Sequence, residues 1–314
     1  MVITQEHRKG SQKPVIVLVG VAIWFGFQAW VMQSAVRASS PLTFNAERFG
    51  VAFVLMALLC LICRQQLTGR ALRGGLILGG IAACSFACES FSVRYDPAGR
   101  ASFLGSLYVI ALPLGAWLLL RKRQSMLTVL GCGLVLIGAF MLLYTPGGTL
   151  LGDRFALIRA GLFALLISAN RHFGSEDFRF MTLIQFGIVC LFSTTGAIAT
   201  NQAPFSFSWE VFGPALACGI GGSAMGVALE LWAQARLPMA TVGVLSFSEA
   251  PMTVLWGLLL GKQTLAVTAL AAFGLIALGT VTVISGDHRK RQGVPFETPR
   301  LNASSHLSDI VSPH

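Results

Sequence analysis

The sequence predicts an all-α membrane protein in which ten transmembrane helices form two inverted five-helix repeats, with both termini in the cytoplasm. Three observations lead to this prediction. Charged residues make up only 11% of the 314 residues and hydrophobic residues 54%, whereas an ordinary soluble domain carries about 25% charged residues. Apolar runs recur along the chain, each long enough to cross a bilayer as a helix. The two halves of the sequence also resemble each other.

The apolar runs fill most of the chain and leave little room for a soluble domain. We place the ten spans at 15–35, 41–63, 74–94, 98–120, 125–144, 154–171, 179–200, 210–235, 239–260 and 264–285. The resulting segments are a cytoplasmic N-terminus 1–14, a first repeat 15–144, an external connection 145–152, a second repeat 153–285 and a tail 286–314. The tail is polar and has no apolar period, so we expect it to be disordered and cytoplasmic.

The distribution of basic residues sets the orientation. A net charge of +10 could suggest nucleic acid. With ten spans, however, the segments on the side of the termini hold roughly three times as many Lys and Arg residues as those on the other side, and the positive-inside rule makes that side the cytoplasm. We therefore expect a lipid bilayer and a small-molecule substrate as partners, and no nucleic acid. The sequence leaves open whether the protein is a monomer or a homodimer.

The internal repeat appears at a shift of 141 residues. At this shift Pro97 falls on Pro238, and GLVLIG (133–138) falls on GLIALG (274–279). Five spans in each half is an odd number, so the second copy enters the membrane from the opposite side. This is the inverted-repeat plan of secondary transporters, whose substrate site lies near the midplane between the copies.

Several motifs resemble those of the EamA-type transporters of the drug/metabolite transporter superfamily. They are IWFG (23–26), ERF (47–49), SLYVIALPLGAWLLLRKR (106–123), GDRFAL (152–157) and LWAQARLPMATVGVLSFSEAPMTVLWGLLLGKQ (231–263). The resemblance covers residues 15–285. It implies a multi-pass carrier of the plasma (inner) membrane; most such proteins export amino acids, related metabolites or toxic organic compounds. Two positions depart from the family pattern, because Ala250 separates Glu249 from Pro251 and Lys262 replaces an acidic residue.

Glu249 is the first candidate for a substrate or proton site. It lies near the middle of the predicted ninth span, where an ionisable group normally faces the protein interior or a water-filled path. Pro251 removes a backbone donor and is expected to loosen the helix nearby. A carboxylate beside a weakened turn suits a site that binds and releases a cation. The alternative is a buried glutamate that hydrogen-bonds to a neighbouring helix.

The repeat and the resemblance supply the other candidate binding residues. Tyr108 is the repeat counterpart of Glu249, and it either hydrogen-bonds a substrate or packs in the interior. Arg48 matches an arginine of the family's second helix, and it either binds a substrate carboxylate or forms an interhelical salt bridge. The remaining candidates are Gln185, which pairs with Arg48 at a slightly different shift, Trp24 in the first span, and Trp232 and Gln234, which share a short segment with Glu230.

Glu89 and Glu230 coincide under the repeat shift and are candidate gating residues. An inverted repeat turns equal positions into opposite depths, so we expect one acid near each mouth of the path. We predict that each pairs across helices only while its own mouth is closed. The alternative is a pair of ordinary interfacial acids.

No metal, cofactor or catalytic site is expected. All five histidines lie in termini or loops, and the acids within spans lack the spacing of a metal or acid–base site. CLIC (60–63) has no second pair of ligands of the kind that zinc needs. The expected function is therefore a secondary transporter that exports a small polar or amphipathic, amino-acid-like metabolite by alternating access, with the proton as the candidate coupling ion. An integral membrane enzyme and a non-transporting receptor or structural subunit are the alternatives.

Overall fold

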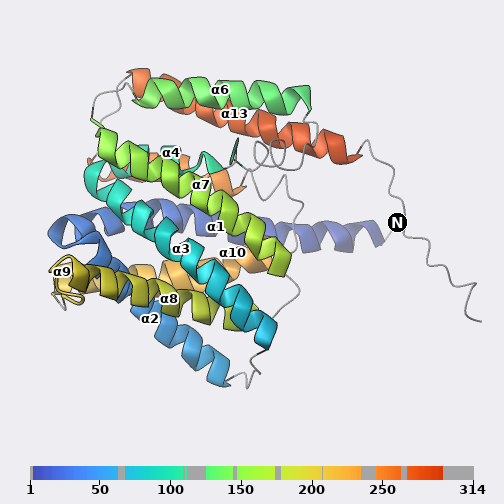
Figure 1. Ribbon diagram of the computed structural model, residues 1–314. Coiled ribbons are helices and arrows are strands. Elements are labelled where there is room, and N and C mark those ends of the chain that lie inside the picture. Colours follow the sequence, from blue (N-terminus) through green and yellow to red (C-terminus); the bar gives the residue numbers. More distant parts are fainter. Residues whose placement is uncertain are drawn as a thin grey trace, which may run out of the picture.

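The computed structural model describes residues 3–62, 68–108, 110–111, 125–143, 147–173, 178–206, 208–234, 245–262 and 267–292. Within these ranges every regular element is a helix (Figure 1). The elements are α1 (Ile3–Ala38), α2 (Pro41–Ile62), α3 (Gly69–Tyr95), α4 (Ala98–Gly105), α6 (Met126–Leu143), α7 (Leu150–Phe173), α8 (Phe178–Ala199), α9 (Trp209–Ala217), the π-helix η1 (Cys218–Gly226), α10 (Val227–Gln234), α12 (Glu249–Leu259) and α13 (Val267–Gln292).

Five stretches of helix are long and apolar enough to cross a membrane. They are Lys13–Ala38, Pro41–Ile62, Gly69–Tyr95, Arg179–Ala199 and Trp209–Glu230, and Met126–Met141 and Val267–Val283 are shorter apolar helices. Large apolar side chains such as Ile62, which is 79% exposed, cover their outer faces. The predicted class of helical membrane protein is therefore confirmed. The count of ten spans, the inversion of the repeats and the orientation of the termini stay predictions.

Helices α6 and α13 lie side by side at one edge of the molecule (Figure 1). A methyl group at Gly131 would lie 2.7 Å from the carbonyl oxygen of Gly279, and one at Gly279 would lie 2.7 Å from the carbonyl oxygen of Gly131. Small residues let helix backbones approach closely within a membrane. The last helices of the two predicted repeats therefore pack against each other through glycines.

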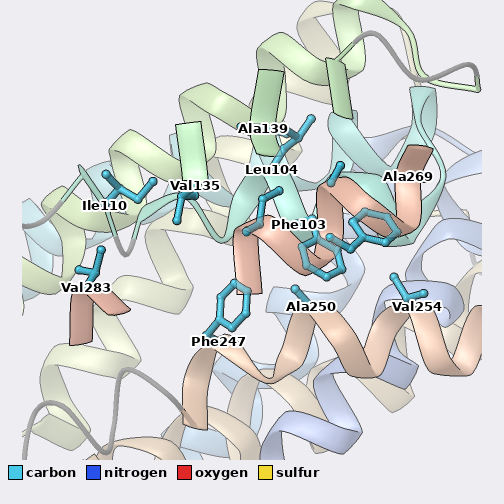
Figure 2. Close-up of a cluster of buried hydrophobic side chains, with 14 of the residues drawn as sticks. Phe103, Leu104, Ile110, Val135, Ala139, Phe247, Ala250, Val254, Ala269 and Val283 are labelled. Atoms are coloured by element: carbon cyan, nitrogen blue, oxygen red, sulfur yellow. The ribbon is translucent and has the colours of Figure 1, made fainter. Parts of the chain in front are cut away.

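Two groups of packed side chains flank α1. In the first, Phe49 of α2 lies 4.7 Å from Phe86 of α3 and 5.7 Å from Phe186 of α8, measured between ring centroids. The second group joins α4, α6, α12 and α13 (Figure 2), and in it Phe103 stacks on Phe273 at 4.1 Å. Helix α1 contacts α3 of the first group and α12 of the second. The interior next to α1 is thus bordered by helices from both halves of the chain.

Two predicted spans are interrupted at matching points, whereas the sequence predicts a loosened helix only at the second, near Pro251. Helix α4 ends at Gly105, and the Ser106 hydroxyl donates to the carbonyl of Phe103 at 2.6 Å. Helix α12 begins at Glu249, directly after Ser248, whose hydroxyl donates to the carbonyl of Leu245 at 2.5 Å. The backbone N–H of each serine bonds to the same carbonyl, at 3.2 Å in both cases. Such three-residue turns compete with continuous helix.

Pro251 lies one turn away from the interruption that its sequence position predicts. It occupies the first turn of α12 and lacks the N–H that would donate to the carbonyl of Phe247, four residues before it. The break at Ser248 therefore lies where a proline at position 251 disrupts a helix. Residues 112–120 and 239–244 of the two interrupted spans lie outside the described residues.

Several boundaries differ from those predicted. The predicted eighth span consists of α9, η1 and α10, and the glycine-rich stretch Cys218–Gly226 takes the wider π-helical turn. Helix α1 begins at Ile3, before the predicted limit at residue 14, and α13 continues to Gln292, past the predicted limit at residue 285. Helix α7 begins at Leu150, inside the predicted external connection. Residues 293–314 of the predicted disordered tail lie outside the described residues.

Candidate functional site

A cavity lies between the two groups of helices. Its charged lining residues in the described part of the chain are Arg48, Glu89, Arg159, Glu230 and Glu249. Uncharged polar side chains are contributed by Gln28, Ser92, Ser102, Tyr108 and Ser246, and apolar walls by residues that include Leu18, Phe25, Met32, Phe86 and Phe163. The cavity therefore combines internal charge with apolar walls, as sites for amphipathic ligands do.

Glu89 of α3 lies between two arginines. The guanidinium Nη2 of Arg159 in α7 lies 2.8 Å from Glu89 Oε1, and Nη1 of Arg48 in α2 lies 3.4 Å from Glu89 Oε2. The Nε of Arg48 also donates to the hydroxyl of Ser223 in η1 at 2.9 Å. Arg48 belongs to the first predicted repeat and Arg159 to the second, so one carboxylate connects the two halves of the chain.

An aromatic ring lies beside each of the two guanidinium groups. The Arg48 guanidinium lies 5.5 Å from the centroid of the Phe86 ring, and that of Arg159 lies 5.4 Å from the centroid of the Phe163 ring. Both distances fall within the range of cation–π attraction. Arg48 thus takes part in the interhelical salt bridge that was one of its two predicted roles, whereas binding of a substrate carboxylate stays a prediction.

Arg159 is a site residue that the sequence reasoning missed. The signal was present, because an arginine within a predicted span is a candidate functional residue on its own. Its partner could not be identified from the sequence, since Glu89 lies 70 residues away along the chain.

Glu249 and Tyr108 follow the two helix interruptions and both line the cavity. Tyr108 packs its ring edge-on against Phe163, with the centroids 5.0 Å apart. The backbone carbonyl of Glu249 accepts a hydrogen bond from the hydroxyl of Thr253 at 3.0 Å. Among the residues that the structure describes, the Glu249 carboxylate forms neither an ion pair nor a hydrogen bond. The repeat-related pair thus meets in one cavity, and its acid is available to a ligand.

Two more buried polar groups of the cavity have no partner within the described residues. They are the amide oxygen of Gln28 and the hydroxyl of Ser246. The indole N–H of Trp24, which the sequence singled out, is also buried and has no partner there. A methyl group at Gly221 would lie 3.0 Å from that nitrogen, so Trp24 packs against η1 beside the cavity.

The other predicted site residues lie elsewhere or remain open. Trp232 is 38% exposed and Gln185 is part-buried on α8, and neither lines the cavity. The side chain of Gln234 lies outside the described residues. Glu89 and Glu230 both line the same cavity, from α3 and α10, rather than two separate ones. Their roles as gates at opposite mouths stay predictions.

A second buried cluster ties the end of α3 to the start of α7. Arg100 Nε and Nη2 donate to the two carboxylate oxygens of Asp153 at 2.7 and 2.8 Å. Asp96 accepts from the backbone N–H of Thr149 at 2.6 Å and from its hydroxyl at 3.1 Å. Burial, the largest cause, and the charge of Asp153 raise the pKa of Asp96, and the hydrogen bonds from Thr149 and the charge of Arg100 lower it, so that the pKa is raised to about 6. The GDRFAL motif therefore forms a link between the halves.

Metal binding finds no support in the described part of the chain. Its His, Cys, Asp and Glu side chains form no group of three or more that could hold a metal ion. The acidic side chains of the cavity instead face arginines or the cavity itself.

Comparison with known proteins places the first half of the chain in a family. Residues 12–144 match the EamA-like transporter family. We refer to these matched residues as the EamA domain. An uncharacterized transporter from Archaeoglobus fulgidus is 28% identical over 153 residues, which are 49% of this chain and 47% of that protein. The alignment thus spans about half the length of this relative.

A solved crystal structure shares the fold. It superposes with a TM-score of 0.59 at 16% sequence identity, covering 91% of this chain and 99% of that one. Identity at this level shows the fold alone, but the likeness extends well beyond the EamA domain.

The resemblance to EamA-type transporters that the sequence predicts is confirmed for the matched residues, and the long apolar helices make the chain a multi-pass membrane protein. The EamA domain contains Arg48, Glu89 and Tyr108, whereas Arg159 and Glu249 lie beyond the matched residues. The cavity is therefore built jointly by the EamA domain and the second half of the chain.

Proposed function

We propose that this protein is a secondary transporter of the plasma membrane. It exports a small polar or amphipathic, amino-acid-like metabolite by alternating access, and a proton is the coupling ion. The observation that supports this proposal most is the position of Glu249. An acid without a partner among the described residues faces an internal cavity, at the start of a helix that begins within a predicted span.

A carboxylate in this position favours exchange of cationic partners. A buried charge without a counter-charge is costly, so the cavity is stable when Glu249 either holds a proton or pairs with a cationic group. A proton and a substrate that compete for one acid cannot occupy it together. That competition couples the exit of one to the entry of the other.

The position of the cavity between the two halves supports alternating access. In carriers with inverted repeats, one half moves against the other around a site at their interface. Here the Arg48–Glu89–Arg159 cluster connects the halves within the cavity. Movement of α7 relative to α2 and α3 would change this cluster, so the binding site and the conformational change involve the same residues.

The test compares metabolites in the medium of strains that lack or overproduce the protein. Overproduction should raise the external level of the substrate, and Glu249→Gln should abolish this rise at near-normal expression, because size is kept and only the charge is lost. Glu210→Gln, at an exposed acid of α9, is the matched control and should export normally. A fully active Glu249→Gln variant would reduce Glu249 to a structural role.

The orientation has a separate test. Leu150 and Met126 are 69% and 79% exposed at the starts of α7 and α6, and the predicted topology places the first outside the cell and the second inside. In intact cells a membrane-impermeant thiol reagent should label Leu150→Cys and spare Met126→Cys. The opposite pattern would reverse the topology and, with it, the side to which each mouth opens.

A further inference from the structure

We propose that the cavity recognises its substrate through a protonated amine, which Glu249 and the amide oxygen of Gln28 receive, and that Arg48 and Arg159 do not serve as receptors for a substrate carboxylate. This inference rests on the proposed function and specifies the substrate class. It predicts that a simple amine without a carboxylate is a sufficient ligand.

Gln28 is a buried acceptor that lacks a donor. Its side chain is 7% exposed and lines the cavity, and no described residue donates to its amide oxygen. A buried acceptor without a partner costs about 1–3 kcal/mol. A methyl group at Gly222 would overlap the Gln28 amide, with the amide oxygen as its nearest atom. This oxygen therefore lies beside Gly222, which also lines the cavity. A ligand that donates a hydrogen bond would remove the cost.

A second glutamine on the same helix shows what a satisfied amide looks like. The amide nitrogen of Gln33 donates to the backbone carbonyls of Val93 and Asp96, at 2.9 and 2.6 Å. Gln33 is 4% exposed, so it is as buried as Gln28. Burial therefore does not distinguish the two residues. Gln33 uses its amide nitrogen to join α1 to the end of α3, whereas the amide oxygen of Gln28 has no donor among the described residues.

The arginines of the cavity are already engaged. Arg48 and Arg159 share the Glu89 carboxylate, and each also faces an aromatic ring. A substrate carboxylate would have to displace Glu89 from between them. By contrast, Glu249 requires no displacement of a described residue. An ammonium group has three donors and no acceptor, which matches a carboxylate and an amide oxygen.

The charges of the cavity favour a cationic ligand at Glu249. Arg48 and Arg159 share Glu89, and no described side chain forms an ion pair with Glu249. An amine cation would supply this counter-charge, whereas an anion would add to the negative charge of Glu249. The apolar walls, which include Phe25 and Met32, then accommodate an aliphatic substituent.

Three probes that share one branched aliphatic tail separate these possibilities. They are 3-methylbutylamine, leucine and 4-methylpentanoate, and their binding to the full chain in lipid nanodiscs is measured by calorimetry. The amine should bind at least as tightly as leucine, and the acid at least about tenfold more weakly, since one charge-assisted hydrogen bond contributes about 1.5–3 kcal/mol.

Variants of Gln28 test the second acceptor. Gln28→Met should lower amine affinity roughly 10- to 100-fold, whereas Gln28→Glu, which keeps an acceptor oxygen, should retain it. Gln33→Met is the matched control; it should lower stability without changing the order of the probes. If Gln28→Met does not fold, Gln28→Glu still decides, because loss of amine binding in that variant would contradict the proposal.

Each outcome is assigned to one proposal. Tighter binding of the acid than of the amine, unchanged amine affinity in a folded Gln28→Met variant, or no binding of any probe would overturn the amine subsite. Flux of the same probes into proteoliposomes tests transport separately. Binding in the expected order without flux would contradict the proposed function and leave the amine subsite intact. Flux with the acid preferred would contradict the amine subsite and leave the proposed function intact.

Discussion

Two buried ion-pair clusters connect the halves of this protein, and they are built differently. At the start of α7, Arg100 binds both oxygens of Asp153, at 2.7 and 2.8 Å. In the cavity, Glu89 divides its oxygens between Arg159 at 2.8 Å and Arg48 at 3.4 Å. In the first cluster one acid binds one base with both oxygens, and we call it the closed pair. In the second, one acid is shared between two bases beside a cavity.

The two clusters also differ in how closely the surrounding backbone packs against them. A methyl group at Gly148 would overlap the Arg100 guanidinium, and one at Gly152 would overlap the Asp96 carboxylate. Backbone thus packs closely against Arg100 of the closed pair and against the neighbouring Asp96, whereas the shared acid borders a cavity. The comparison shows that a buried charge does not by itself indicate a binding site. A buried charge that is incompletely paired and borders a cavity does indicate one.

The largest effect should follow from opening the closed pair. Asp153→Asn removes the carboxylate that binds two nitrogens of the Arg100 guanidinium, and removing one member of a buried pair costs about 3–5 kcal/mol. We expect a marked loss of folded protein, measured by thermal unfolding in nanodiscs. The double variant Arg100→Leu/Asp153→Leu should recover most of the stability, because it leaves no unpaired charge. Unfolding of Asp153→Asn at the wild-type temperature would contradict the distinction between the clusters.

An intermediate effect should follow from neutralising the shared acid. Glu89→Gln removes the charge that holds Arg48 and Arg159 together, with an expected loss of about 1–3 kcal/mol. We also predict that it favours an outward-open state and that Glu230→Gln favours an inward-open state. Modification rates of single cysteines at Ser92 and Val227, two cavity-lining positions on α3 and α10, should change in opposite directions in the two variants.

The same pair of variants can contradict the gating prediction. Unchanged accessibility in both would make Glu89 and Glu230 ordinary interior acids, and changes in the same direction would exclude separate gates. Loss of stability in Glu89→Gln without any change in accessibility would mean that Glu89, like Asp153, only stabilises the fold.

Sequence reasoning identified the membrane class and the repeat-related pair of Tyr108 and Glu249, because apolar length, a charge within a span and an internal repeat are local signals. It missed the partnership of Glu89 with Arg159, since that depends on how α3 and α7 cross. Gln28 gave no signal either. A glutamine in a span is unremarkable until the approach of Gly222 determines which way its amide faces.

One of the two helix interruptions was missed for a related reason. Serines are common in membrane helices, and the turns at Ser106 and Ser248 become visible only through their hydrogen bonds to the third preceding residue. Pro251 gave the stronger sequence signal but occupies a position in the first turn of α12 that tolerates proline. Its disruptive effect falls one turn earlier, at the carbonyl of Phe247, so only the interruption at Ser248 was expected from the sequence.

The smallest effect should be a pH dependence that belongs to the closed cluster. Burial raises the pKa of Asp96 to about 6, above the value of about 3.9 for an aspartate in an unfolded chain. The folded protein therefore binds this proton more tightly than the unfolded chain does. The stability that protonation adds is fully present below about pH 4 and is lost as the pH rises to about 6, with a total of about 2 kcal/mol or less.

Asp96→Asn isolates this contribution, because the amide keeps an acceptor oxygen for Thr149 and cannot ionise. Thermal unfolding of both proteins at pH 4, 5, 6 and 7 gives the difference in their stability at each pH. The contributions of the other acids are the same in both proteins and cancel in this difference. Wild type should lose stability relative to Asp96→Asn between about pH 4 and 6 and run parallel to it above. A relative gain of stability with rising pH would mean that Asp96 folds as a stabilised anion. In that case it would act as a counter-charge in the Arg100–Asp153 cluster, and the closed pair would be a three-member network like the one around Glu89.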